Sequence, residues 1–348
     1  MSLNCNKLFR CVLLLSRQCT SAIWIFAGVG LGFGQTLQLP SPEKELTVAG
    51  AFVSQRTFPI TSNGYLISFS RVSSDNANQI VLYSLSTGAQ QQIAFSLKNS
   101  SATTIIDAAV LSPSNVLVVG TYVASTDGTQ QNFVSEVDFS GTVQTTFMLG
   151  VYTPERVCAA SDGTLWTLGQ QLADEGGPYL SYDMLRNYQV DGSLVRSYLP
   201  RGALPNVMLD LHPAGSVFGQ EVDRAFLACG ESSVGVYIAN PARIWLEIDM
   251  ATGKSQQWTV KTLAGSIPTG LTLTSAGTVY ASFFFGKQAN RKLYNLSLGS
   301  SNPAVWEEVT DPSNLFATIL GRDGAAIVYI RGSEAPALNP IINWSTPQ

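Results

Sequence analysis

Two short patterns alternate along almost the whole chain, and each recurs about every 50 residues. In the first, a tight-turn sequence precedes a run of β-branched and aromatic residues, as in residues 62–64 before 65–69. Glycine and asparagine in the turn suit the positive φ of tight hairpins, and the run suits a buried strand. Further copies of this turn are at residues 113–115, 161–163, 231–233, 275–277 and 322–324.

The second pattern is a strand of alternating apolar and polar residues that ends in a polar turn containing glycine. These turns end at Gly88, Gly141, Gly192, Gly253 and Gly299. Because another alternating strand follows each turn, one repeat contains two hairpins and therefore four strands. Both patterns are stretched at the same place, which predicts an insertion at about residues 203–223.

Four antiparallel strands in every ~40–50 residues are typical of a β-propeller blade. The sequence therefore predicts an all-β chain that forms a six-bladed β-propeller with four antiparallel strands in each blade. An open two-sheet sandwich is the alternative, and the regular six-fold period argues against it. The predicted blades are residues 53–98, 102–150, 154–202, 224–262, 267–310 and 314–345.

On these turn-and-strand units, and on the turns of the form Asp-x-x-Gly, the chain resembles six-bladed β-propellers of the NHL-like kind. The resemblance covers about residues 45–346 and concerns the fold alone, because no family-specific catalytic motif accompanies it. The sixth blade lacks a clear fourth strand. Residues 45–49 are expected to supply it, which would close the ring and leave no open edge between the first and last blades.

The inner strands of a propeller blade are covered on both faces by neighbouring blades, so they should be apolar at nearly every position. Residues 116–119 form such a run. For the same reason we expect four tryptophans to pack between blades rather than to stack on a sugar. They are Trp166, Trp245, Trp258 and Trp306.

Charged residues are scarce in this chain, at 13% against a usual ~25%, and the formal net charge is −4. This balance lacks the basic surface that nucleic acids attract and the polybasic patch that anionic lipids attract. The single histidine, His212, excludes an HExxH zinc site and any site with several histidine ligands. Several classes of enzyme and of nucleic-acid-binding protein are thereby excluded.

Residues 1–34 have the organisation of a secretory signal peptide. Three basic residues precede an uncharged apolar run at residues 20–34, which is shorter than the ~20 residues that a membrane-spanning helix needs. Small residues at the end of the run predict cleavage after Gly34. The mature chain, residues 35–348, would then be a secreted or periplasmic propeller domain without a transmembrane span. The alternatives are an uncleaved anchor and a mistaken start.

Cys5, Cys11 and Cys19 lie in this leader, so the mature chain keeps Cys158 and Cys229. In an oxidising compartment these two cysteines can form one disulfide. Two small buried thiols are an equally good interpretation, because free cysteine is often buried in strands. The sequence leaves both alternatives open.

Ligands of β-propellers usually bind at one mouth of the central channel. We expect that mouth where loops enter the innermost strands and join the second strands to the third. Charged and amide side chains near the predicted starts of the innermost strands suit a polar ligand or a Ca²⁺ ion, and solvated loop charges are the alternative. These candidate ligand-binding residues are Asp107, Glu155, Arg156, Asp223, Arg224 and Asn314. Residues 170–183 and 203–223 are expected to cover the same face.

No catalytic motif accompanies these residues: the sequence has no G-x-S-x-G elbow, and no serine is positioned for a triad with His212. The first functional hypothesis is therefore an exported scaffold that binds a protein, peptide or glycan at the channel mouth without catalysis. The alternative is a metal-assisted hydrolase or lactonase, similar to six-bladed propellers of the gluconolactonase type, with a divalent ion such as Ca²⁺ in the channel. Residue types that such a site needs are present at Asp107, Glu155, Asp223 and Asn314.

Overall fold

The computed structural model describes residues 37–47, 60–69, 78–171, 181–204, 213–217, 220–223, 225–239, 242–286, 290–299, 303–311, 317–331 and 341–347. These residues form strands almost throughout, and the one helix among them is a single 3-10 turn at Arg201–Ala203. No helix within these ranges is long and apolar enough to cross a membrane. The predicted signal peptide, residues 1–34, lies outside the described residues.

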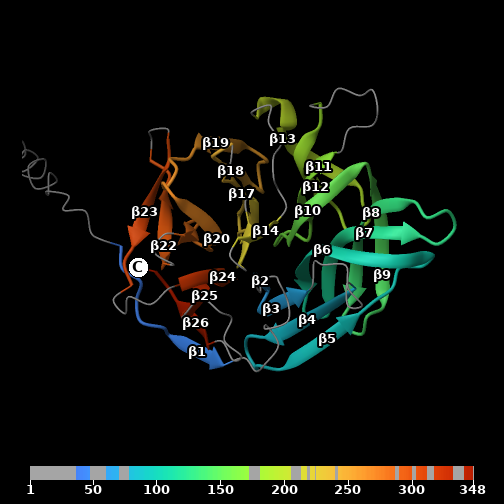
Figure 1. Cartoon of the computed structure of the whole chain (residues 1–348), viewed down its shortest axis with the longest axis horizontal. Coiled ribbons are helices and arrows are strands. Elements are labelled where there is room, and N and C mark those ends of the chain that lie inside the picture. The colour runs from blue at the N-terminus through green and yellow to red at the C-terminus, as the bar shows by residue number, and fades with distance from the viewer. Residues whose placement is uncertain are drawn as a thin grey trace, which may run out of the picture. The chain divides into compact units, whose positions relative to one another are not determined.

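Six four-stranded antiparallel sheets form a ring in which each sheet is one blade (Figure 1). The predicted fold class, a six-bladed β-propeller with four antiparallel strands in each blade, is confirmed. Blade 1 contains β2 (Ile60–Ser62), β3 (Tyr65–Phe69), β4 (Gln79–Ser84) and β5 (Gln90–Ala94). Blade 2 contains β6 (Ser100–Ser112), β7 (Asn115–Ala124), β8 (Gln130–Asp138) and β9 (Val143–Gly150). Blade 3 contains β10 (Tyr152–Ala159), β11 (Leu165–Gln171), β12 (Asp183–Tyr188) and β13 (Leu194–Pro200).

The second half of the chain repeats this arrangement. Blade 4 contains β16 (Ala225–Cys229), β17 (Ser233–Ile238), β18 (Ile244–Asp249) and β19 (Ser255–Thr259). Blade 5 contains β20 (Ser266–Leu273), β21 (Val279–Phe285), β22 (Asn290–Ser297) and β23 (Val305–Val309). Blade 6 contains β24 (Ala317–Asp323), β25 (Ala326–Arg331), β26 (Ile341–Ser345) and the N-terminal strand β1 (Lys44–Thr47). The innermost strands are β2, β6, β10, β16, β20 and β24, which lie against their counterparts in neighbouring blades or close to them.

Blade 6 is completed from both ends of the described chain. Strand β1 pairs antiparallel with β26, with Leu46 opposite Ile342 and Lys44 opposite Trp344. The Lys44 ammonium lies 4.7 Å from the centre of the Trp344 indole and donates a 2.6 Å hydrogen bond to the carbonyl of Leu85 in blade 1. The predicted closing segment is thus a strand at Lys44–Thr47, and residues 48 and 49 lie outside the described residues.

The hydrophobic core lies between the blades. Each large cluster of buried apolar side chains is shared by two neighbouring blades; Ile67 of blade 1 and Val118 of blade 2 belong to one such cluster. Trp166, Trp245 and Trp306 are at most 4% exposed, and the half-buried Trp258 packs against the cluster between blades 4 and 5. The tryptophans therefore pack between blades, as the sequence predicts.

One glycine is required by this packing. The indole of Trp245 in β18 lies across Gly235 in β17, where a Cβ would come within 2.1 Å of Cη2 of the indole. A larger residue at this position would displace the largest fully buried side chain of the described core. The glycine thus permits close packing inside the sheet rather than a turn.

A separate hairpin follows blade 3. Strands β14 (Pro213–Val217) and β15 (Gln220–Asp223) form their own two-stranded sheet, within the insertion predicted at residues 203–223. The backbone of β15 lies close to β20, the innermost strand of blade 5. Nothing is described of the hairpin side chains, and His212 lies outside the described residues, as do residues 172–180 of the other predicted covering segment.

Aspartate side chains stabilise the polar turns between the third and fourth strands of three blades. In blade 2, Asp138 Oδ1 accepts hydrogen bonds from the hydroxyl and the backbone N–H of Ser140 and from the backbone N–H of Thr142. Asp191 and Asp249 hold the corresponding turns of blades 3 and 4 in the same way. These hydrogen bonds favour the ionised carboxylate and lower the pKa of all three aspartates.

Replacing Ser140 by alanine should raise the pKa of Asp138, because the Ser140 hydroxyl is the strongest of the hydrogen bonds that lower it. NMR titration of the aspartate carboxyl carbons measures this change. Asp191, in another blade, is the internal control and should keep its pKa. An unchanged pKa of Asp138 would contradict this account of the turn.

The lowered pKa of Asp138 also makes the stability of the fold depend on pH. Because the folded-state pKa of Asp138 is lowered, its carboxylate stabilises the fold above the unfolded-state pKa of about 3.9. That contribution is lost as the pH falls through the folded-state pKa. The free energy of unfolding should therefore fall less in Ser140→Ala than in the wild type when the pH is lowered from above the unfolded-state pKa of Asp138 to below its folded-state pKa.

Candidate functional site

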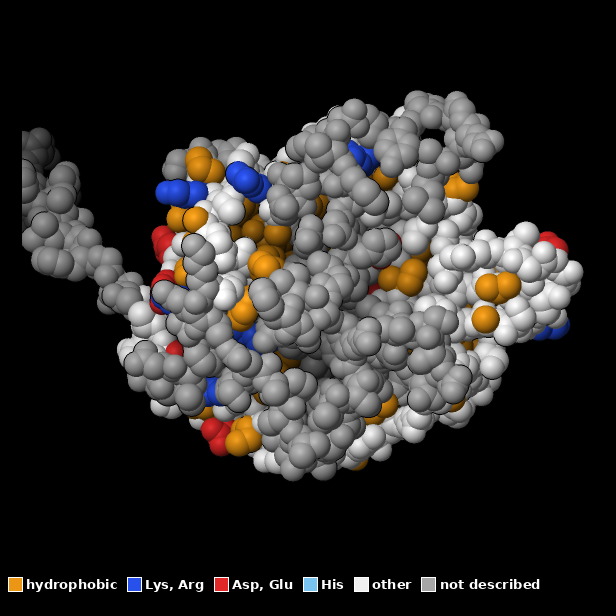
Figure 2. Space-filling model, viewed as in Figure 1, with side chains coloured by type: hydrophobic (Ala, Val, Ile, Leu, Met, Phe, Trp, Pro, Cys, Tyr) orange, Lys and Arg blue, Asp and Glu red, His pale blue; other side chains and the backbone are white. Residues whose placement is uncertain are grey.

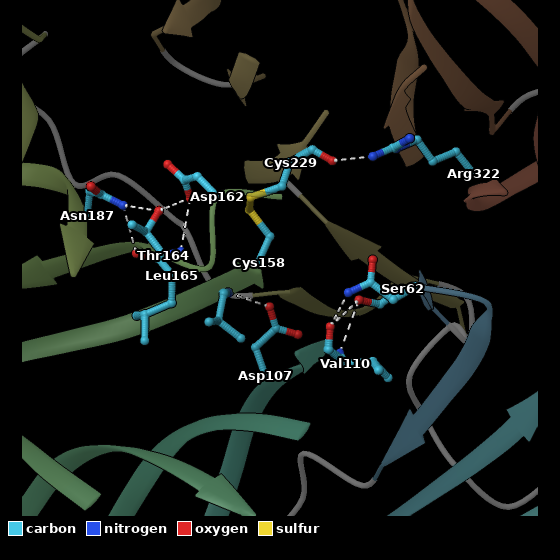
Figure 3. The surroundings of a disulfide bond; sticks show 12 residues. Ser62, Asp107, Val110, Cys158, Asp162, Thr164, Leu165, Asn187, Cys229 and Arg322 are labelled. Carbon is cyan, nitrogen blue, oxygen red and sulfur yellow. Dashed lines mark hydrogen bonds between the residues drawn. A yellow bond between two sulfur atoms is a disulfide. The ribbon is translucent and has the colours of Figure 1, made fainter. Parts of the chain in front are cut away.

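The innermost strand of each blade is an edge strand, so one side of its backbone is not paired within the sheet. Polar side chains at the inner ring bond to the backbone of the neighbouring blade. Between blades 1 and 2, Ser62 Oγ accepts a 3.0 Å hydrogen bond from the N–H of Val110, and Asn63 Nδ2 donates a 2.6 Å bond to its carbonyl (Figure 3). The first hairpin turn of blade 1 is thereby fixed to blade 2.

A buried carboxylate makes the next link. A β-bulge between Ile105 and Asp107 interrupts the pairing of β6 with β7, and bulges redirect the side chains beside them. Asp107 is 2% exposed, and its Oδ2 accepts a 2.9 Å hydrogen bond from the N–H of Val157 in blade 3 (Figure 3). This predicted ligand-binding residue therefore joins blades 2 and 3.

Blade 3 has a bulge at the equivalent place, between Pro154 and Arg156. Arg156 is 4% exposed, and its Nε donates a 3.0 Å hydrogen bond to the carbonyl of Ala225 in blade 4. Its Nη1 donates a 2.6 Å bond to the backbone carbonyl of Glu155, whose own side chain is 1% exposed. Both residues are buried within the inner ring rather than solvated in a surface loop.

The other three predicted residues are described less fully. Asp223 ends β15, where its backbone pairs with Pro213, and its side chain is not described. Arg224 and Asn314 lie outside the described residues. The structure thus brings Asp107, Glu155 and Arg156 to the inner ring, and a ligand-binding role for any of the six residues stays a prediction.

A cavity of about 390 Å³ occupies one end of the central channel. It lies where the innermost strands turn into the second strands, and all six innermost strands contribute to its wall. This is the end opposite to the predicted mouth, and Asp107, Glu155 and Arg156 are not among its lining residues. The larger apolar residues among those that line it are Val157, Leu227, Leu271, Leu273 and Leu320.

A disulfide bond joins Cys158 of β10 to Cys229 of β16, with 5.8 Å between the two Cα atoms. It connects the innermost strands of blades 3 and 4, and both cysteines are half-buried in the cavity wall (Figure 3). Of the two alternatives that the sequence leaves open, the structure therefore contains the disulfide.

The hairpin of blade 6 brings two charged residues to the cavity, Arg322 and Asp323. The Asp323 carboxylate accepts a 3.1 Å hydrogen bond from the indole N–H of Trp344. Arg322 points towards blade 4, with Nη2 3.5 Å from the carbonyl oxygen of Cys229 (Figure 3). From the sequence, residues 322–324 are predicted only to form a turn. The available signal was the pair of adjacent charged residues, Arg322 and Asp323, which no other copy of this turn contains.

The described residues contain no group of three or more His, Cys, Asp or Glu side chains placed to hold a metal ion. Asp107 and Glu155 are the two described members of the predicted metal set, and neither lines the cavity. On the face shown in Figure 2, the described charged side chains are scattered, without a broad patch of either sign. Apart from Arg322 and Asp323, the described residues that line the cavity offer polar and apolar contacts.

No protein-family model matches this chain, and no curated protein matches its sequence. Among solved structures, an acylaminoacyl peptidase of Pyrococcus horikoshii is similar at 12% identity and a TM-score of 0.44, over 79% of this chain and 41% of that chain. The β-propeller domain of the Trilobed protease from Pyrococcus furiosus is similar at 10% identity and a TM-score of 0.41, over 88% and 94%. A PL25 polysaccharide lyase, an ulvan lyase, is similar at 12% identity and a TM-score of 0.44, over 91% and 84%.

The six sheets described above define the class of this protein, a six-bladed β-propeller with a cavity at one end of its channel. This chain covers about two fifths of the length of the peptidase. At these identities and scores, the similarities carry no information about what the chain binds.

Replacing Cys158 and Cys229 together by serine should lower the free energy of unfolding by about 4 kcal/mol, because the disulfide closes a loop between residues 71 apart in the sequence. Chemical unfolding of the chain from Gln35 onward measures this difference. A reducing agent should destabilise the wild type similarly and leave the double variant unchanged. Two free thiols in the unreduced wild type would contradict the bond.

Proposed function

We propose that this protein is an exported ligand-binding scaffold that recognises a protein, peptide or glycan at the channel cavity, without catalysis. The cavity carries the proposal, because all six blades contribute to its wall and its volume suits part of a ligand of small-molecule size. Among the described residues of its wall, the ionisable side chains outside the disulfide are Arg322 and Asp323, and the Asp323 carboxylate accepts a hydrogen bond from Trp344. Such a wall suits recognition better than bond cleavage.

The rigidity of the wall supports binding. The disulfide and the hydrogen bonds of Asp107 and Arg156 hold the innermost strands of blades 2, 3 and 4 together. A preformed site loses little conformational entropy when a ligand binds, and this favours affinity. The cavity is therefore suited to act as a fixed receptor surface.

Export and the NHL-like subtype of the propeller are parts of this proposal. The predicted leader, residues 1–34, is the argument for secretion to the periplasm or the exterior. A disulfide suits the same location, because such bonds persist in oxidising compartments. The repeated glycine-containing turns and the closure by the N-terminal strand support the NHL-like resemblance.

A cavity-filling substitution tests the site. Leu227 is half-buried in the cavity wall, so Leu227→Trp should occupy part of the cavity and reduce ligand binding at least tenfold. Ligand-observed NMR with a panel of short peptides and disaccharides measures the loss. The matched control is Leu194→Trp on the outer strand β13, where leucine is 55% exposed. Binding that survives Leu227→Trp would place the ligand elsewhere.

Thermal unfolding with and without Ca²⁺ tests the alternative, a metal-assisted hydrolase. In that alternative the ligands of the ion are Asp107, Glu155, Asp223 and Asn314. We expect the melting temperature to be the same in EDTA and in millimolar Ca²⁺, because the Asp107 carboxylate already accepts a hydrogen bond from Val157. A ligand that binds only the folded state raises the melting temperature. A rise of several degrees that is lost in Asp107→Asn would favour the hydrolase.

A further inference from the structure

Arg322 lines the cavity and reaches from blade 6 towards blade 4. It lies near the end of β24, and its guanidinium contacts blade 4, although blade 5 lies between blades 6 and 4 in the ring. Its side chain is 22% exposed, so the guanidinium is partly removed from water while it still faces the cavity. A cation in this position is reachable by whatever enters the cavity.

The contacts of the Arg322 guanidinium in the described structure are all long. Nη1 lies 3.4 Å from the carbonyl oxygen of Gly324 and 3.6 Å from Glu231 Oε1, and Nη2 lies 3.5 Å from the carbonyl oxygen of Cys229. Charge-assisted N–H···O hydrogen bonds are usually about 2.7–2.9 Å long. The five N–H donors of this guanidinium therefore retain capacity for a stronger acceptor.

The Glu231 carboxylate interacts only weakly with the Arg322 guanidinium. The backbone of Glu231 is held in place because its carbonyl accepts a 2.7 Å hydrogen bond from Ser161 Oγ, but its side chain is 58% exposed. An exposed ion pair of this kind is screened by water and contributes little free energy. A ligand anion can therefore replace the Glu231 carboxylate beside Arg322 at little cost.

The rest of the wall indicates what the anion is attached to. Leu227 and Leu271 line the cavity and are half-buried, so part of each remains accessible, whereas Leu273 and Leu320 line it from the cores between blades. The other charged group, Asp323, is directed to Trp344. The cavity thus offers one planar cation beside leucine side chains, and a carboxylate carried on an apolar body matches both.

Resting on the proposed binding function, we propose that Arg322 pairs with a carboxylate of the ligand while an apolar group of the same ligand contacts the leucines. The guanidinium fork and the carboxylate form two parallel hydrogen bonds. A free organic acid and the C-terminal residue of a peptide both present this chemistry.

Isothermal titration with N-acetyl-leucine and its uncharged amide tests the proposal. The wild type should bind the acid roughly ten- to a hundredfold more tightly than the amide, which is the range expected for a charge-assisted hydrogen bond. Arg322→Gln should remove this preference. Arg196→Gln, on the exposed part of the outer strand β13, is the matched control and should keep it. Glu231→Gln should tighten acid binding by up to about fivefold.

The outcomes separate this inference from the function on which it rests. Equal binding of acid and amide, both lost in Leu227→Trp, would overturn the carboxylate pairing and leave the cavity standing as the site. The pairing would also be overturned if the affinity for the acid were unchanged in both Arg322→Gln and Leu227→Trp. The same holds if neither probe binds at millimolar concentration. A leucine-terminated hexapeptide that binds more tightly than N-acetyl-leucine, but only with a free C terminus, supports a peptide source; equal affinity supports a small free acid.

Discussion

Burial between neighbouring blades is the constraint on which the rest of this structure depends. Each sheet has apolar side chains on both faces, and a sheet of four strands cannot cover both of them by itself. The cover comes from the adjacent blade, as with Ile67 and Val118, or with Trp245 across the interface between blades 4 and 5. A row of such sheets is stable only when its first and last members also meet. The pairing of β1 with β26 meets that condition, because the N-terminal strand completes the blade that packs against blade 1.

The same ring creates a second problem at its centre, where six edge strands point unpaired backbone towards the channel. Polar side chains form hydrogen bonds with backbone atoms of the next blade and so satisfy part of this unpaired backbone. They belong to Ser62, Asn63, Asp107 and Arg156. Bulges immediately before Asp107 and Arg156 give these two residues their direction. Two of the few charged residues of this chain, Asp107 and Arg156, therefore connect neighbouring blades. At the cavity, by contrast, the guanidinium of Arg322 makes only long contacts with its described neighbours.

The fold could be predicted because every repeat contains the same local signals, such as the turn at Asn63 and Gly64 and the alternating strand before Gly141. The location of the site could not be predicted in the same way. Asp107 and Arg156 lie close to the predicted inner strands, but bulges absent from any sequence pattern turn them into the ring. The cavity lies at the other end of the channel because side-chain sizes and strand register around all six blades decide where space remains. Those are properties of the closed ring, and a single repeat does not contain them.

Completion of blade 6 by β1 also affects how the protein is made. Of the described strands, Lys44–Thr47 leaves the ribosome first and its partner Ile341–Ser345 leaves last. During synthesis the growing chain can form only an open arc, whose end blades each have an uncovered apolar face. The contact that finishes the fold joins segments separated by nearly the whole domain, and contacts of this kind form slowly. A chaperone that binds before Ile341–Ser345 is synthesised would therefore act on a chain that has not yet closed the ring around its cavity.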